Sequence, residues 1–179
     1  MPTVILDRDG VIGEDTDGIP SVAEWQPLPG SLQAIGRLSQ NGYRVVLVLN
    51  QAELAGRKFS IEDFNAINQK MMSHLAQFGG QIEAIFFCPC SSRDADCNCR
   101  KPKPDMLLNL AGRLRINLEG VPCVGDRISD LQSARAAGAQ PILVKTGRGA
   151  RIVNDNKVPK DVPVYENLAA FVNDLLGKH

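Results

Sequence analysis

Short runs of apolar residues recur along the chain, and each is bounded by polar residues or glycine. The first run, Val4 to Leu6, stops abruptly at a carboxylate, and the second, residues 43–49, is rich in β-branched side chains. Apolar runs of this length are typical of strands buried on both faces of a parallel sheet. We therefore predict five strands, over residues 4–6, 43–49, 82–87, 121–124 and 141–144.

The segments between these runs have the periodicity of amphipathic helices. Leu32, Ile35 and Leu38 fall on one helical face, and Ser60 with Asp63 resembles an N-terminal cap ahead of a long apolar stripe. The predicted helices cover residues 31–41, 61–78, 104–114, 130–137 and 167–176. Strands that alternate with helices in this way predict an α/β fold, a Rossmann-like parallel sheet with helices on both faces. We expect one domain over residues 1–179.

Composition narrows the class of protein. The 179 residues are 44% hydrophobic and 22% charged, which is ordinary for a globular domain. Lys and Arg number 20, as do Asp and Glu, so the net charge is zero and no basic face for nucleic acid is expected. No apolar stretch is long enough to span a bilayer, and no signal-peptide pattern precedes the first strand. We expect a cytoplasmic protein that binds neither nucleic acid nor membrane, and a monomer.

Polar residues follow four of the predicted strands. Asp7 and Asp9 follow the first, and Gly10 beside them allows close backbone approach to an anion. The other strand ends are followed by Asn50-Gln51, Arg100-Lys101 and Asp126. Because the carboxyl ends of parallel strands share one edge of the sheet, these groups can converge into a site for Mg²⁺ and phosphate. The alternative for the first pair alone is a turn with solvated acids.

Four of the five cysteines lie within twelve residues. They form two pairs with one residue between the members of each, Cys88 with Cys90 and Cys97 with Cys99. Four thiolates at this spacing can close a tetrahedral Zn²⁺ site with no open position, which is typical of a structural site. Reduced thiols or disulfides are the alternatives. A metal there would stiffen the loop, residues 88–99, that leads into Arg100.

The sequences Ile5-Leu6-Asp7-Arg8-Asp9-Gly10, Asn50-Gln51, Arg100-Lys101-Pro102 and Gly125-Asp126 resemble the four motifs of the haloacid-dehalogenase (HAD) phosphatase superfamily. The four-cysteine segment is similar to that of its small branch without a cap domain, which contains the heptose 1,7-bisphosphate 7-phosphatases and histidinol-phosphate phosphatases. The resemblance implies a HAD fold and a phosphoric monoester hydrolase. It also implies a sugar bisphosphate as the small-molecule substrate, in the pathway to the lipopolysaccharide core.

The resemblance implies a role for each matching residue. Asp7 is the nucleophile and a Mg²⁺ ligand, and Asp9 is the general acid and base, with its carbonyl on the metal. Asp126 completes the protein's share of the metal shell, and Lys101 neutralises the transferring phosphoryl group. We assign the remaining candidates to substrate binding: Arg8, Gly10, Asp15, Asn50, Gln51 and Arg100.

Three residues depart from the family pattern, so the resemblance does not determine the identity of the substrate or the rate of its hydrolysis. Leu49 stands where the family has Thr or Ser, whose hydroxyl binds the phosphoryl group; Ala52 removes a second hydroxyl and Glu53 adds an anion. One lost donor can lower a rate by ~10²-fold. Histidinol phosphate or another sugar phosphate is therefore an alternative substrate. A zinc-stabilised binding protein with little turnover is the alternative from another class.

Overall fold

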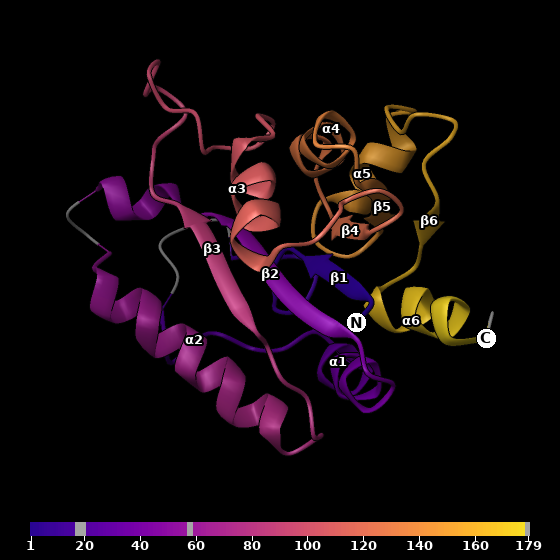
Figure 1. The fold of residues 1–179 in the computed structure, drawn as a ribbon. Coiled ribbons are helices and arrows are strands. Elements are labelled where there is room, and N and C mark those ends of the chain that lie inside the picture. The colour runs from indigo at the N-terminus through magenta and orange to yellow at the C-terminus, as the bar shows by residue number, and fades with distance from the viewer. Residues whose placement is uncertain (17–20, 57–58, 178–179) are drawn as a thin grey trace.

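A six-stranded parallel sheet forms the centre of the molecule, and its strand order is β3-β2-β1-β4-β5-β6 (Figure 1). The computed structural model describes residues 1–16, 21–56 and 59–177, so part of the segment between the first predicted strand and the first predicted helix lies outside it. The strands are β1 Thr3–Leu6, β2 Arg44–Asn50, β3 Ala84–Cys88, β4 Pro122–Gly125, β5 Gln140–Val144 and β6 Val164–Tyr165. The predicted α/β class and the five predicted strands are confirmed.

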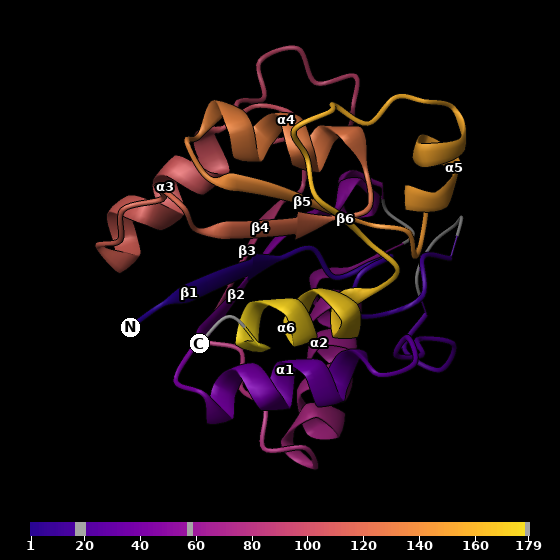
Figure 2. The ribbon, with the colours of Figure 1, turned by 90° about the vertical axis from the view of Figure 1, so that its right-hand side faces the viewer.

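Helices cover both faces of this sheet. One layer holds α1 Ser31–Gln40, α2 Ile61–Ala76 and α6 Leu168–Gly177, and the other holds α3 Asp105–Leu114, α4 Ile128–Ala136 and α5 Gly149–Asn154 (Figures 1 and 2). In the first layer α1 packs against both α2 and α6. None of the helices in the described ranges is both long and apolar enough to cross a membrane.

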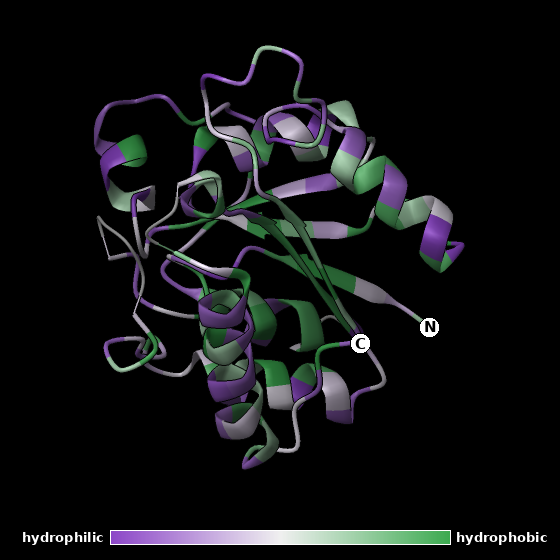
Figure 3. Ribbon diagram, turned by 90° about the vertical axis from the view of Figure 1, so that its left-hand side faces the viewer, coloured by the Kyte–Doolittle hydropathy of each residue, from purple (hydrophilic) through white to green (hydrophobic). Residues whose placement is uncertain are grey.

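Successive side chains of the central strands point to opposite faces of the sheet, so the core is divided between the two helix layers. Val4 and Leu6 of β1 belong to the cluster under α1, α2 and α6, whereas Ile5 belongs to the cluster under α3 and α4. The central strands are therefore apolar through their middle residues, while the helices expose polar faces (Figure 3). This arrangement buries both faces of the sheet and leaves the strand ends as the places where polar residues can gather.

The order of the strands decides which ends meet. The chain moves outward from β1 to β2 and β3, then returns to place β4 on the other side of β1. At such a reversal two loops diverge from neighbouring strands and open a crevice at their carboxyl ends. Asp7 follows β1 and Asp126 follows β4, so the two carboxylates become neighbours.

Candidate active site

Three carboxylates converge at the crevice between β1 and β4. Oxygens of Asp7, Asp126 and Asp130 lie within 4.8 Å of one another. The main-chain N–H of Asp7 donates to the carbonyl of Val124 at 3.0 Å, which extends the pairing of β1 with β4 to the site. Asp130 comes from the first turn of α4, where its carboxylate also accepts from the N–H of Arg127 at 3.0 Å. These carboxylates give the site a dense negative charge.

Asp130 was not among the expected site residues. The sequence predicts it only as the first residue of the helix over residues 130–137. The structure shows that the same side chain also faces the crevice, since its other oxygen lies 2.6 Å from the amine of Lys101. The signal in the sequence was its position one helical turn after Asp126.

Burial and mutual repulsion raise the pKa values of Asp126 and Asp7. Burial raises the pKa of Asp126 to about 8, and the carboxylates of Asp7 and Asp130 add to the effect. Burial also raises the pKa of Asp7 to about 6, although the nearby Lys101 amine opposes the rise. One oxygen of Asp126 accepts from the N–H of Arg148 at 2.8 Å. The other, Oδ1, is buried without a hydrogen-bond partner among the described residues. Such oxygens fit a hard divalent cation.

Lys101 lies among these acids with only 5% of its side chain exposed. Its amine is 3.0 Å from Asp7 and 2.6 Å from Asp130, and it donates to the carbonyl of Val48 at 2.9 Å. Burial works against the charged amine, but the two carboxylates outweigh it and raise the pKa of Lys101. Lys101 is therefore a fixed cation beside the expected nucleophile.

Asn50 holds the main chain of Lys101 in place. Its side-chain oxygen accepts from the N–H of Lys101 at 3.0 Å, and its amide N–H donates to the carbonyl of the same residue at 3.1 Å. We expected this amide to donate to phosphate. In the structure both ends of the side chain contact the loop that carries the lysine, so Asn50 positions Lys101. Asn50 also lines the cavity, and its donation to phosphate stays a prediction.

Asp9 reaches the site from the turn after β1, and Arg8 holds it there. Nε and Nη2 of Arg8 each donate to a different oxygen of Asp9 at 2.9 Å. Nη2 of Arg8 also donates to Gln51 at 2.8 Å. Arg8 is fully buried at 0% exposure, whereas the side chain of Asp9 remains 31% exposed. Arg8, which we expected to bind substrate, is buried and contacts Gln51 and Asp9, whereas Gln51 also donates to Glu53 and lines the cavity.

Close packing against Asp126 requires glycine at position 10. Its φ is 84°, and a Cβ at this position would lie 2.2 Å from an oxygen of Asp126. Its N–H donates to the carbonyl of Gly13 at 2.7 Å, and its carbonyl accepts from the hydroxyl of Thr146 at 2.7 Å. Both main-chain groups of Gly10 are thus engaged within the protein, and its expected contact with substrate stays a prediction.

A cavity of about 350 Å³ opens over the acids. Seven of the expected residues line it, namely Asp7, Asp9, Asp15, Asn50, Gln51, Arg100 and Lys101. The lining also includes Ala52, Glu53 and Pro102, which the sequence analysis singled out, and residues that it did not: Glu14, Thr16, Ser21, Trp25, Arg127, Ser129 and Asp130. The cavity is therefore lined by both carboxylates and basic side chains, which suits a small molecule that carries phosphate groups together with a divalent cation.

Two of the expected binding residues stand on the wall with partners of their own. The carboxylate of Asp15 lies 2.6 Å from Nη2 of Arg127 and 3.3 Å from Nε of Arg148. Arg100 donates to the carbonyl of Cys90 at 3.1 Å, which ties it to the cysteine loop. Asp15 therefore fixes arginines rather than standing alone, and the cysteine loop sets the position of Arg100.

The residues that depart from the family pattern divide between core and cavity. Leu49 is only 2% exposed and packs in the core beneath β2, so its side chain offers nothing to the cavity. Glu53 lies on the cavity wall, where it accepts from the amide of Gln51 at 2.7 Å. Ala52 and Glu53 belong to a short 3-10 helix, Ala52–Ala55, that periodicity did not predict.

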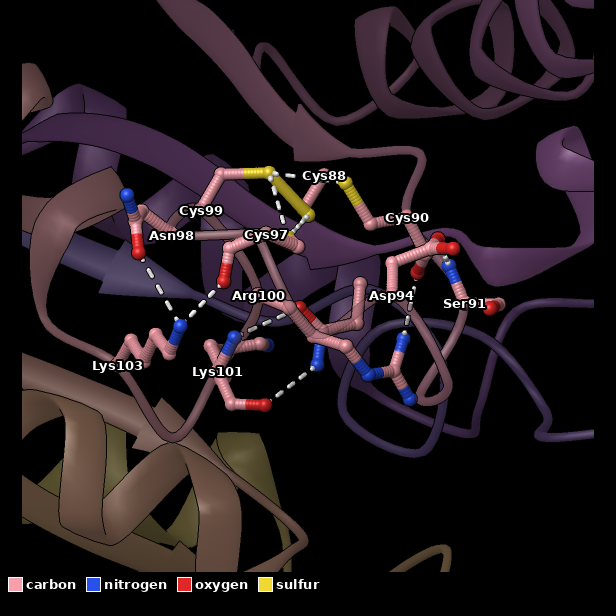
Figure 4. The surroundings of a disulfide bond; sticks show 11 residues. Cys88, Cys90, Ser91, Asp94, Cys97, Asn98, Cys99, Arg100, Lys101 and Lys103 are labelled. Atoms are coloured by element: carbon pink, nitrogen blue, oxygen red, sulfur yellow. Dashed lines mark hydrogen bonds between the residues drawn. A yellow bond between two sulfur atoms is a disulfide. The ribbon is translucent and has the colours of Figure 1, made fainter.

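The four expected zinc ligands gather in one place (Figure 4). The sulfurs of Cys88, Cys90, Cys97 and Cys99 all lie within 4.8 Å of one another. The structure joins Cys88 to Cys99 as a disulfide, and Cys97 lies 3.6 Å and Cys90 3.9 Å from the sulfur of Cys99. The sequence left zinc, reduced thiols and disulfides open, and the structure contains one disulfide. The convergence of all four sulfurs, which one disulfide does not require, also fits a single metal ion.

Comparison with known proteins agrees with this site. The HAD-hydrolase-like family model matches residues 98–171. Two curated relatives are named D-glycero-beta-D-manno-heptose-1,7-bisphosphate 7-phosphatase. The relative from Bordetella bronchiseptica is 48% identical over 98% of both chains. The relative from Pseudomonas putida is 42% identical over 98% of this chain and 100% of its own.

Solved structures show the same likeness. The D,D-heptose 1,7-bisphosphate phosphatase from B. bronchiseptica, complexed with magnesium and phosphate, matches with a TM-score of 0.96 and 47% identity over 100% of both chains. The corresponding phosphatase from Burkholderia thailandensis matches with a TM-score of 0.78 and 36% identity, over 98% of this chain and 99% of its own. The chain belongs to the HAD-like hydrolase family, in the group of phosphatases that these relatives represent.

Proposed function

We propose that this protein is a magnesium-dependent phosphatase that removes the 7-phosphate of D-glycero-D-manno-heptose 1,7-bisphosphate. The observation that carries the proposal is the convergence of Asp7, Asp126 and Asp130 with the Lys101 amine at the ends of β1 and β4. The proposal is supported by the nearly full-length similarity to relatives named as 7-phosphatases. It is also supported by the magnesium and phosphate in the related crystal structure.

The reaction proceeds in two steps. A carboxylate oxygen of Asp7 attacks phosphorus, the bond from phosphorus to the sugar oxygen breaks, and Asp9 gives its proton to that oxygen. Asp9 then takes a proton from water as the water oxygen attacks the aspartyl phosphate, which releases phosphate and restores the Asp7 carboxylate. Lys101 neutralises charge on the transferring group throughout.

The acidic cluster fits a resident Mg²⁺. Asp7, Asp126 and the main-chain carbonyl of Asp9 would hold it, and Asp130 stands beside them. The buried Oδ1 of Asp126, which makes no hydrogen bond to the described residues and lies 3.9 Å from Nε of Arg127, supports this assignment, because a cation would satisfy it. When bound, the ion supplies positive charge that offsets the charge of the phosphoryl group. Asp130 also holds the Lys101 amine at 2.6 Å, so it positions the lysine as well.

A second metal, zinc, is proposed for the loop over residues 88–99. Cys88, Cys90, Cys97 and Cys99 would hold it as thiolates, and the disulfide would be an oxidised form of the same set. Protein prepared under reducing conditions should carry one equivalent of zinc by elemental analysis. Cys97→Ser should lose it, and the matched control Cys123→Ala, at a buried cysteine in β4, should keep it. Absence of zinc from the unaltered protein would contradict the assignment.

The remaining expectations are part of the same proposal. Residues 1–179 form one domain with no large cap, which acts as a monomer in the cytoplasm on a small molecule. Its product enters the pathway to the lipopolysaccharide core sugar. The zero net charge supports a small-molecule substrate rather than nucleic acid.

A phosphate-release screen tests the function. The purified protein is assayed with Mg²⁺ against heptose 1,7-bisphosphate, histidinol phosphate and simple sugar phosphates. The isosteric variant Asp7→Asn controls for contaminating phosphatases and should release almost no phosphate. Faster release from histidinol phosphate would reassign the substrate. No release from any of them would favour a binding protein of the same fold.

A further inference from the structure

Helix α2 carries a polar side chain on its buried face. Asn68 is 6% exposed and lies among Phe64, Ile67 and Met71, which pack into the core. A buried amide requires a hydrogen-bond partner, because an unsatisfied one destabilises the fold. The partner is Arg8, whose Nη1 donates to the side-chain oxygen of Asn68 at 2.9 Å. This bond joins the middle of α2 to the turn after β1.

A second residue of α2 contacts the same guanidinium. The Arg8 guanidinium carbon lies 5.6 Å from the centre of the Phe64 ring. Phe64 and Asn68 are four positions apart, so both project from the same face of the helix. The Phe64 ring presents its electron-rich face to the guanidinium cation. The hydrogen bond to the Asn68 amide fixes the rotation of the planar guanidinium group. Together they hold a fully buried arginine in one orientation.

That orientation determines where Asp9 points. Nε and Nη2 of Arg8 hold both oxygens of Asp9 at 2.9 Å, and Gln51 accepts a further bond from Nη2 at 2.8 Å. The planar fork of arginine matches a carboxylate at two points and leaves it little freedom to turn. Asp9 is partly exposed on the cavity wall, and without this grip its side chain could adopt other rotamers.

We propose that Asn68 is a positioning residue for the general acid and base, which acts on Asp9 through Arg8. The inference rests on the proposed function, since it gives Asp9 that role. Proton transfer needs the carboxyl group within hydrogen-bond reach of the leaving oxygen. A displacement of about 1 Å can lower a rate by ~10²-fold. Asn68 therefore affects catalysis although it does not line the cavity.

Leaving-group dependence separates this role from a merely structural one. A sugar oxygen needs a proton to depart, whereas acetyl phosphate and 4-nitrophenyl phosphate have leaving groups that need none. We expect Asn68→Leu, which keeps the volume but removes the acceptor, to lower the first-turnover rate with heptose bisphosphate by about tenfold or more. The first-turnover rate with the activated phosphates should fall by less than about threefold. Asn68→Asp retains the acceptor and should restore the rate with the sugar substrate.

Two further variants complete the experiment. Ile67→Val, at the neighbouring buried position of α2, controls for lost packing and should leave the ratio of the two rates unchanged. Asp9→Asn should show the same leaving-group dependence as Asn68→Leu, only larger. If Asp9→Asn retains the rate with heptose bisphosphate, the role given to Asp9 in the proposed function is wrong. If Asp9→Asn shows the dependence but Asn68→Leu lowers both rates equally or neither, the inference about Asn68 is overturned.

Discussion

Asp126 offers the sharpest test of the crowded acidic site. Its pKa in the folded protein is about 8, against 3.8 for an ordinary aspartate, because it is buried beside Asp7 and Asp130. The folded state therefore binds the proton of Asp126 more tightly than the unfolded chain does. It follows that the metal-free protein loses stability as the pH rises from 3.8 to about 8.

The magnitude follows from the two pKa values. One pKa unit corresponds to about 1.4 kcal/mol, so the full difference amounts to roughly 6 kcal/mol above the folded-state pKa. Asp126→Asn removes the buried charge, but the new amide is itself a buried polar group whose desolvation costs free energy, so the variant recovers only part of this cost. We expect the variant to gain about 3 kcal/mol of unfolding free energy at about pH 9 without metal, and little at about pH 4.

Urea unfolding with a chelator present, at several pH values, measures this effect. The variant keeps an oxygen for the N–H of Arg148, so its fold should be retained. Magnesium should stabilise the unaltered protein increasingly as the pH rises, and should stabilise Asp126→Asn much less. The control Asp161→Asn, at an exposed pair with Arg135, should change little. A metal-free variant less stable than the unaltered protein at alkaline pH would refute the reasoning.

Two other substitutions test neighbouring parts of the site. Leu49→Thr should lower the unfolding free energy by about 1–3 kcal/mol, because it empties part of the core. It should also raise kcat for phosphate release if the new hydroxyl reaches the phosphoryl group. An unchanged kcat would contradict the expected contact of this hydroxyl with the phosphoryl group. Lys70→Met should raise KM several-fold and change kcat less, because the Lys70 amine donates to the carbonyls of Val22, Ala23 and Trp25 and so holds one wall of the cavity. Lys160→Met, at an exposed lysine, is its control, and an equal KM in both would count against the role of Lys70.

Much of the site could be predicted from the sequence because the sheet is parallel. Buried apolar runs fixed five strands, and parallel strands present their carboxyl ends at one edge. The sequence alone therefore predicts one site that contains Asp7, Asp9, Lys101 and Asp126. It also predicts that the two cysteine pairs lie close together. The elements that were missed are short: a single turn in Ala52–Ala55, the six residues of α5 and the two residues of β6. Elements of so few residues are too short to show a periodic pattern of apolar side chains.

Only the tertiary structure decided which side chains contact each other around that edge. From the sequence, Asp130 is only the first residue of a predicted helix, Asn68 lies within the predicted helix over residues 61–78, and Arg8 is assigned to substrate binding. Packing of α4 beside β4 turned Asp130 toward Lys101, and packing of α2 beneath β2 buried Arg8 between Asn68 and Asp9. Hydrophobic periodicity is a local property of the chain. The partner of a buried charge depends on how separate elements pack, because the charge must be paired with whatever polar group they bring to it.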